Sequence, residues 1–447
     1  MLTGDLPLRA VSINYPRHFL GKTMVSTGAR AARTHLPQPG TVVVRDFRNG
    51  FAPEGMASLK VVQWNIERGY KLESIARELR ELKADVIALQ EVDWGCERTG
   101  SVDVGGRLGK MLGYNYIFLC EFEELQSDIR SESTQGGGVH GNAILTRFDL
   151  AHDPRIIRHR HQPVNWERPA HPLAKLEPRR GERVSLAVDL VVPWDVDKKE
   201  QGTGLLTVYC CHLEVFCGAT HRVAQFSEIF ADARRVICED DSGRGGGNYD
   251  VARRMMILGD LNSMGNGIAR LSPSYCKDLT RWLNFGWSEA EWWHHNVFSV
   301  RDDGKDPAPP ANMRLKRWGL DHQVCVDAVN PNFYDPYLPG HDVTLDNPRY
   351  ALGPIRLMTG KLDWLLLRGL AAFEYGTGND KYSASDHKLL VAEVRPGSLV
   401  WPKLWGRNDM NELHPLVTIL ICIITFAAGW WVAENWLSNM PGFPTSG

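Results

Sequence analysis

Two short segments of the chain carry side chains that could do chemistry. Asp260 and Asn262 end an apolar run, residues 255–258, that is typical of a buried strand. Because residues two apart in a strand point to the same face, this carboxylate and amide are expected to converge on one point, as a hard metal ion or an attacking water requires. Asp386 and His387 stand side by side before another apolar run.

Four further apolar runs have polar side chains at one end. Asn65 ends the first of these runs, Glu91 the second and His212 the third, and Asp363 begins the fourth. A polar group is stable in a core only when it is paired. The repeated pattern therefore predicts one shared polar site at the rim of a sheet sandwich.

These segments, and the order in which they follow one another along the chain, resemble those of the endonuclease/exonuclease/phosphatase superfamily. This superfamily includes DNase I-like nucleases, inositol-polyphosphate phosphatases and neutral sphingomyelinases. The resemblance covers about residues 58 to 396, and it is specific for the superfamily but not for a substrate. It implies a four-layered α/β sandwich, with two mainly antiparallel sheets flanked by helices. The matching segments are Trp64-Asn65-Ile66, residues 90–93, residues 141–147, His212-Leu213-Glu214, residues 259–262, Leu362-Asp363-Trp364 and Ser385-Asp386-His387.

The residues and the resemblance together predict Mg²⁺-dependent hydrolysis of a phosphoester, in particular a phosphodiester attacked in line by water. Such hydrolysis needs a cation on the phosphoryl oxygens, an in-line water and a stabilised leaving oxygen; Mn²⁺ is a second candidate cation. The predicted metal ligands are Asn65, Glu91 and Asp386. The predicted catalytic residues are His212, Asp260, Asn262, Asp363 and His387, and the predicted substrate contacts are Asn142 and Arg147.

Within this set, Asp260 is expected to orient or deprotonate the water, and Asn262 to hold the phosphate or that water. The resemblance implies that Asp363 pairs with His387, and that His212 is a hydrogen-bond donor or a leaving-group acid beside the phosphate. Arg147 fits a phosphate contact or a solvated charge at a strand end equally well.

The chain divides into a catalytic part and flanking parts. The motifs run from Asn65 to His387, which favours one large domain in a chain of 447 residues. The predicted parts are a partly disordered N-terminal extension (1–57), the catalytic domain (58–396), a linker (397–414), a transmembrane helix (415–433) and a short tail (434–447). Residues 71–83 have apolar residues at helical spacing, which predicts an amphipathic helix that covers the sheet.

Residues 415–433 contain no charged side chain. A membrane-spanning helix needs about 17–25 mainly apolar residues, so this run qualifies, although a buried core helix is the alternative. Lys403 and Arg407 precede the run and no Lys or Arg follows it. The positive-inside rule then predicts a tail anchor that leaves the catalytic domain in the cytosol.

The substrate stays open between two classes of phosphodiester. The net charge is −2, whereas proteins that bind bulk nucleic acid often carry a basic excess, which weakens the nuclease interpretation. The predicted anchor favours a membrane-lipid phosphodiesterase, sphingomyelinase-like, whose partners would be a lipid headgroup and the membrane. A catalytically dead membrane scaffold is a third interpretation, which the intact residue set disfavours. No protein partner is inferred from the sequence.

Overall fold

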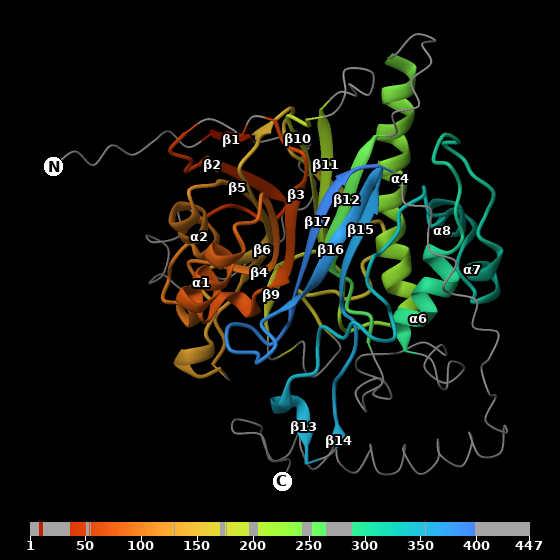
Figure 1. The fold of residues 1–447 in the computed structure, drawn as a ribbon. Coiled ribbons are helices and arrows are strands. Elements are labelled where there is room, and N and C mark those ends of the chain that lie inside the picture. The colour runs from red at the N-terminus through yellow and green to blue at the C-terminus, as the bar shows by residue number, and fades with distance from the viewer. Residues whose placement is uncertain are drawn as a thin grey trace.

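The protein contains two β-sheets that pack face to face, with helices on both outer faces (Figure 1). The computed structural model describes residues 9–11, 36–50, 53, 55–128, 130–169, 175, 177–195, 204–243, 253–264, 288–353 and 355–397. Each sheet contains one parallel pair of strands, β3 with β4 and β11 with β12, and the other pairs are antiparallel. The predicted four-layered α/β sandwich is confirmed.

The first sheet has the strand order β1-β2-β5-β6-β4-β3-β17-β16, and β9 pairs with β5. Its strands are β1 (Arg9–Val11), β2 (Thr41–Asp46), β3 (Leu59–Asn65), β4 (Val86–Trp94), β5 (Asn115–Glu124), β6 (Val139–Thr146), β9 (Arg179–Gly181), β16 (Leu370–Gly378) and β17 (Leu389–Pro396). The sequence placed residues 1–57 outside the catalytic domain, yet β2 pairs with β5 and is part of this sheet. The apolar side chains of Val42 and Val43 explain this position, because both are buried there.

The second sheet has the order β15-β12-β11-β10-β7, and β8 pairs with β10. Its strands are β7 (Asp149–Leu150), β8 (Arg155–Arg158), β10 (Val184–Val191), β11 (Leu205–His212), β12 (Arg254–Asp260) and β15 (Asp363–Arg368). A two-stranded ribbon, β13 (Ala351–Leu352) with β14 (Ile355–Arg356), projects below the sandwich in Figure 1.

The helices cover the two outer faces. The α-helices are α1 (Leu72–Leu82), α2 (Val104–Leu112), α4 (Ala219–Gly243), α6 (Glu289–Trp293), α7 (Met313–Arg317) and α8 (His322–Asp327). The 3₁₀ helices of the described residues are η1 (Glu67–Gly69), η2 (Glu97–Thr99), η3 (Glu132–Thr134) and η6 (Pro348–Tyr350), and η5 (His294–Phe298) is a π-helix. Helix α1 buries Ile75, Ala76 and Leu79, so the helix predicted over residues 71–83 is confirmed.

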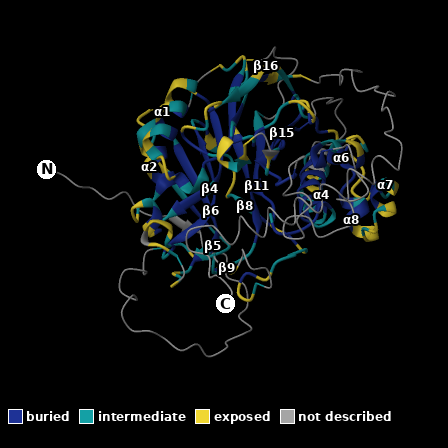
Figure 2. Cartoon of the chain, turned by 90° about the horizontal axis from the view of Figure 1, so that it is seen from below, coloured by how far each residue is buried: buried dark blue, intermediate teal, exposed yellow. Residues whose placement is uncertain are grey.

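The core follows from the alternation of side chains along each strand. Val61 of β3 lies between the sheets, whereas Val62 points outward to the layer of α1 and α2. In β12, Leu258 lies between the sheets and Ile257 faces the layer of α4. Burying one such side chain stabilises the fold by about 1.5–3 kcal/mol. Figure 2 shows the result from below, with buried strands enclosed by partly exposed helices.

Among the residues that the structure describes, no helix has the length and apolar character needed to cross a bilayer. The predicted span, residues 415–433, lies outside these residues, as do most of the linker and all of the tail.

Candidate active site

The parallel strand pairs bring the predicted polar residues to one edge of the sandwich. Because parallel strands end at the same edge of a sheet, Asn65 at the end of β3 lies near the end of β4, and His212 of β11 lies beside Asp260 of β12. Asp363 at the start of the antiparallel strand β15 pairs in register with Asp260. These four side chains are buried, and that of Glu91 in β4 is half-buried.

Asp260 lies at the centre of this group. Its Oδ2 accepts a hydrogen bond of 2.9 Å from Asn65 Nδ2, and its Oδ1 accepts one of 2.8 Å from the backbone N–H of Asn262. Burial and the neighbouring carboxylate of Asp363 raise the pKa of Asp260 to about 7, against the effect of His387. A carboxylate with a pKa near neutrality is suited to accept a proton from water.

His387 forms an ion pair with Asp363. The two side chains meet at 2.8 Å between Nδ1 and Oδ2, and Gln63 Nε2 donates to the other oxygen of Asp363 at 3.0 Å. Burial opposes a charge on the imidazole, but Asp363, and after it Asp260, outweigh burial and raise the pKa of His387 well above its usual value. The ring is therefore a cation whose Nε2 lies 3.9 Å from Asp260 Oδ2.

The loop that carries His387 is tied to the end of β3. Ser385 Oγ donates to the carbonyl oxygen of Asn65 at 2.7 Å, and Trp64 Nε1 donates to the carbonyl oxygen of His387 at 3.1 Å. Segments that are more than 300 residues apart in the chain are thus fixed to each other.

His212 approaches Asp260 from the other side, with 3.6 Å between His212 Nε2 and Asp260 Oδ2. Its second ring nitrogen, Nδ1, lies 3.1 Å from Arg183 Nη1. Burial, followed by the charge of Arg183, lowers the pKa of His212 well below its usual value. One charged imidazole, His387, and one neutral imidazole, His212, therefore flank the carboxylate of Asp260.

Three residues of the site have left-handed backbone conformations. The φ angles are 49° at Glu67, 56° at Glu91 and 50° at Asn262. Such a conformation costs a non-glycine residue of order 1–3 kcal/mol and persists only where the surroundings enforce it. Gly259 meets a different constraint, because a Cβ atom there would lie 2.4 Å from the carbonyl oxygen of Cys211 on the adjacent strand.

A second group of polar side chains, the acidic group, consists of Asn65 and the carboxylates of Glu67, Glu91 and Asp386. The Nδ2 atom of Asn65 is 3.3 Å from Glu91 Oε1, and the Oδ1 atom of Asn65 accepts from the backbone N–H of Glu67. Burial raises the pKa of Glu67, and the charges of Asp386 and Glu91 add to this effect. The guanidinium of Arg349 joins two members of the group, at 2.7 Å from Glu67 Oε1 and 2.9 Å from Asp386 Oδ2.

This second group has the donor chemistry of a site for a hard divalent cation. Carboxylate and amide oxygens are the ligands that Mg²⁺ and Mn²⁺ prefer, and the carboxylates repel one another in the absence of a cation. The predicted ligands Asn65, Glu91 and Asp386 belong to it. Glu67 was missed in the sequence, although its position two residues after Asn65 was a usable signal.

Asp260, Asp363 and His387 are a further candidate for cation binding, because one ligand atom from each lies within 4.8 Å of the others. The bond between His387 Nδ1 and Asp363 already uses two of these side chains. The neighbouring carboxylates of Glu67, Glu91 and Asp386 have no such bond to a histidine among the described residues.

The structure treats the two predicted substrate contacts differently. Asn142 of β6 is fully buried, and neither polar atom of its amide has a hydrogen-bond partner among the described residues. Arg147 lies beyond the far end of β6, where its Nη1 is 2.8 Å from Asp85 Oδ1. Asp85 precedes the start of β4, whereas the site lies toward the end of that strand. Arg147 is therefore not brought to the site, and its position fits the alternative of a strand-end charge.

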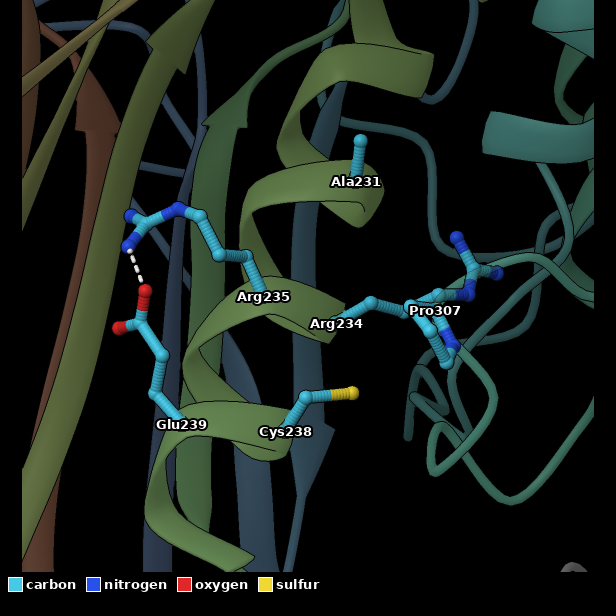
Figure 3. A pocket seen from close by; sticks show the side chains of 6 residues that line it. All are labelled: Ala231, Arg234, Arg235, Cys238, Glu239 and Pro307. Atoms are coloured by element: carbon cyan, nitrogen blue, oxygen red, sulfur yellow. Dashed lines mark hydrogen bonds and ion pairs between the residues drawn. The ribbon is translucent and has the colours of Figure 1, made fainter. Parts of the chain in front are cut away.

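A hollow of about 420 Å³ lies elsewhere, on the outer side of α4 (Figure 3). Arg235 in its wall pairs with Glu239 at 2.8 Å. Further along α4, Asp240 binds Arg253, which directly precedes β12. The hollow thus lies toward the start of β12, at the opposite end of this strand from Asp260.

Residues 62–387 match the family described as Endonuclease/Exonuclease/phosphatase family. The chain belongs to this family, and its class is that of the hydrolases of phosphoric esters. The superfamily predicted from the motifs is confirmed. Members of the family typically depend on a divalent metal ion.

Solved structures that are similar to the chain include those of three proteins. An endonuclease/exonuclease/phosphatase from Beutenbergia cavernae DSM 12333 is 17% identical, covering 77% of this chain and 72% of its own, with a TM-score of 0.44. The human Nocturnin catalytic domain with bound sulfate anion is 15% identical, with coverages of 79% and 97% and a TM-score of 0.39. ANGEL2, a 2',3'-cyclic phosphatase, is 17% identical, with coverages of 76% and 96% and a TM-score of 0.41. No curated protein matches the chain.

Proposed function

We propose that the protein is a Mg²⁺-dependent phosphodiesterase in which water attacks the phosphorus in line. The observation that carries the proposal is the arrangement around Asp260, a buried carboxylate held by Asn65 and flanked by His212 and His387. This arrangement supplies a proton acceptor for water next to positively polarised donors for phosphoryl oxygens.

Glu91, Asp386 and Asn65 would hold the cation, and Glu67 is placed to join them. When bound, the ion supplies positive charge to the phosphoryl oxygens. Mn²⁺ has the same preference for oxygen ligands and is expected to substitute. Arg349 neutralises part of this group in the structure described here, so it must share or leave these carboxylates when the cation binds.

The chain's own residues perform the remaining steps. Asp260 orients the attacking water and accepts its proton, while Asn262 holds the water or a phosphoryl oxygen. The imidazolium of His387 and the amide of Asn142 bind phosphoryl oxygens, where the negative charge develops. Pre-organised donors of this kind typically account for about 10²–10³ in kcat each.

The experiment is a hydrolysis assay on purified protein with a chromogenic phosphodiester, nucleic acid, sphingomyelin and phosphoinositides, each with Mg²⁺, with Mn²⁺ and with EDTA. We expect hydrolysis of at least one phosphodiester with either cation and none in EDTA. Full activity in EDTA would remove the cation from the account. Repeating the assay at increasing salt distinguishes a nucleic acid substrate from a lipid substrate, since binding to nucleic acid weakens steeply as salt rises.

We also propose that residues 415–433 anchor the protein in a membrane with its catalytic domain in the cytosol. The support is the uncharged run and the position of Lys403 and Arg407 before it. A chain truncated after Arg407 is expected to leave the membrane fraction and to retain activity on a water-soluble phosphodiester. Recovery of the truncated chain in alkali-washed membranes would contradict the anchor.

A further inference from the structure

The hydrogen bond between Arg183 and His212 has only one possible direction. A guanidinium group has five N–H donors, no acceptor, and stays protonated in proteins. Arg183 Nη1, 3.1 Å from His212 Nδ1, must therefore donate, and Nδ1 must offer its lone pair. A neutral imidazole carries one N–H, so that proton belongs on Nε2, the nitrogen that lies 3.6 Å from Asp260 Oδ2.

Arg183 is itself held in place. Its Nη1 lies 3.1 Å from Glu121 Oε2, and the other oxygen of Glu121 accepts from the backbone N–H of Val184 at 3.3 Å. The guanidinium carbon lies 5.1 Å from the centre of the Phe122 ring. Both charged side chains are buried, at 3% and 0% exposure. Burying an ion pair is costly and seldom needed for stability alone, so a role in orienting His212 accounts for its presence.

The two imidazoles beside Asp260 have partners of opposite kind. Asp363 can only accept from His387 Nδ1, which favours the doubly protonated ring. Arg183 can only donate to His212 Nδ1, which disfavours that form. The lowered pKa of His212, caused first by burial and then by Arg183, agrees with this direction.

We infer that Arg183 is a positioning residue that fixes His212 as a neutral Nε2–H donor toward the reacting phosphoryl group. The inference rests on the proposed function for the identity of that group. It also excludes one of the two roles expected for His212, that of leaving-group acid, because a neutral ring with Nδ1 engaged cannot release its Nε2 proton to a leaving oxygen. His212 stabilises charge and transfers no proton.

The first test needs neither substrate nor metal. In full-length protein with ¹⁵N-labelled histidine rings, His212 is assigned by comparison with His212→Asn, and the ring shifts show which nitrogen carries the proton. We expect a bare Nδ1 and a protonated Nε2. A proton on Nδ1 would overturn the inference, whatever the variants do.

Variants then separate the hydrogen bond from the charge. Arg183→Met is expected to give a mixture of tautomers, and Arg183→Lys, which keeps a donor, to keep the wild-type tautomer. Arg179→Met is the matched control, because Arg179 is a buried arginine whose charge also lowers the pKa of His212 while its guanidinium pairs with Glu124 and Glu177. A tautomer change in Arg179→Met as large as in Arg183→Met would overturn the role of the hydrogen bond.

Kinetics on the phosphodiester provide the second test. Loss of a partner that orients a metal-binding side chain typically costs about 10–100-fold. We expect a loss of the same order in kcat for Arg183→Met, with little change in KM, and partial recovery in Arg183→Lys. Unchanged kcat in a folded Arg183→Met protein would overturn the inference. If Arg183→Met does not fold, the inference is tested by the tautomer of His212 in the wild-type protein and by the tautomer and kcat of Arg183→Lys. A wild-type protein with the expected tautomer but no phosphodiesterase activity would defeat the proposed function and leave the orientation of His212 standing.

Discussion

Asp363 determines the charge of the imidazole with which it pairs. It is fully buried, accepts from His387 Nδ1 and Gln63 Nε2, and leaves Nε2 of His387 directed to Asp260. An imidazolium at this point is a fixed positive charge in a region that water reaches poorly, where electrostatic interactions are stronger than in bulk water.

Replacing Asp363 with Asn is expected to remove this charge while keeping the shape of the side chain. His387 would then be neutral near pH 7, and kcat should fall by about 10²–10³, the usual cost of one lost electrostatic contact. The measurement is kcat at saturating Mg²⁺, with circular dichroism to verify the fold. A kcat within a few-fold of wild type would show that His387 does not act as a cation.

Asn142 is expected to lower stability while serving function. Its buried amide lacks partners among the described residues, and an unpaired buried polar group costs about 1–3 kcal/mol. Asn142→Leu should therefore leave the free energy of unfolding unchanged or higher, while kcat falls. The matched control is Asn115→Leu, which removes a 2.7 Å bond to the carbonyl oxygen of Phe148 and should destabilise the fold. Strong destabilisation by Asn142→Leu would argue for a structural role.

At the scale of elements, the segment between α8 and β15 leaves the sandwich and returns over the acidic group. Its turn η6 begins at Pro348 and is capped by Asn347, whose side chain accepts from the backbone N–H of Arg349. That geometry places Arg349 over Glu67 and Asp386, and Tyr350 donates to Asp386 at 2.7 Å. This turn thus reaches two of the carboxylates of the acidic group.

Arg349→Met is expected to tighten the binding of Mn²⁺ or Mg²⁺ several-fold, because a guanidinium that occupies the same carboxylates competes with the cation. Isothermal titration of the metal into EDTA-treated protein measures this directly. Arg356→Met on the same projection, which loses a 2.9 Å pair with Asp346, is the control and should leave affinity unchanged. Weaker binding in Arg349→Met would mean that Arg349 supports the site instead of competing with the cation.

Much of the candidate site could be predicted from the sequence, because many of its residues belong to short motifs. Asp260 and His212 end apolar strands and Asn262 follows closely, so the repeated pattern predicted one shared polar site, and the resemblance to the superfamily placed His212 beside the phosphate. Arg183 and Arg349 belong to no such pattern, since their roles depend on which strands and turns lie opposite them. Strand β2 fell within the predicted N-terminal extension, because its partner β5 cannot be identified from local sequence.

At the scale of the whole molecule, burial of ionisable groups links stability to pH. His159 is buried, its Nε2 lies 3.0 Å from Ser185 Oγ, and burial lowers its pKa to about 4. An unfolded histidine titrates near 6.5, so the unfolded chain takes up this proton first as the pH falls. Stability from this residue is therefore present above about pH 6.5 and is lost progressively toward pH 4.

The expected loss from this group is up to about 3 kcal/mol, from a pKa difference between about 6.5 unfolded and about 4 folded. His159→Gln removes the titration, so its free energy of unfolding should vary less than that of wild type between pH 6.5 and 4. Urea unfolding at several pH values measures the difference. Parallel curves for the two proteins would show that His159 is accessible to protons in the folded state.

Above all, we propose that the protein is a cation-dependent phosphodiesterase in which Asp260 orients the attacking water and accepts its proton. The most direct measurement is the rate of phosphodiester hydrolysis against free Mg²⁺ for wild type, Asp260→Asn and Asp85→Asn, the last being a carboxylate toward the far end of the same sandwich. We predict saturable activation by Mg²⁺ in wild type and Asp85→Asn, and a rate lower by about 10²–10³ in folded Asp260→Asn at every Mg²⁺ concentration. Equal rates in wild type and Asp260→Asn, or hydrolysis that persists without a divalent cation, would contradict the account.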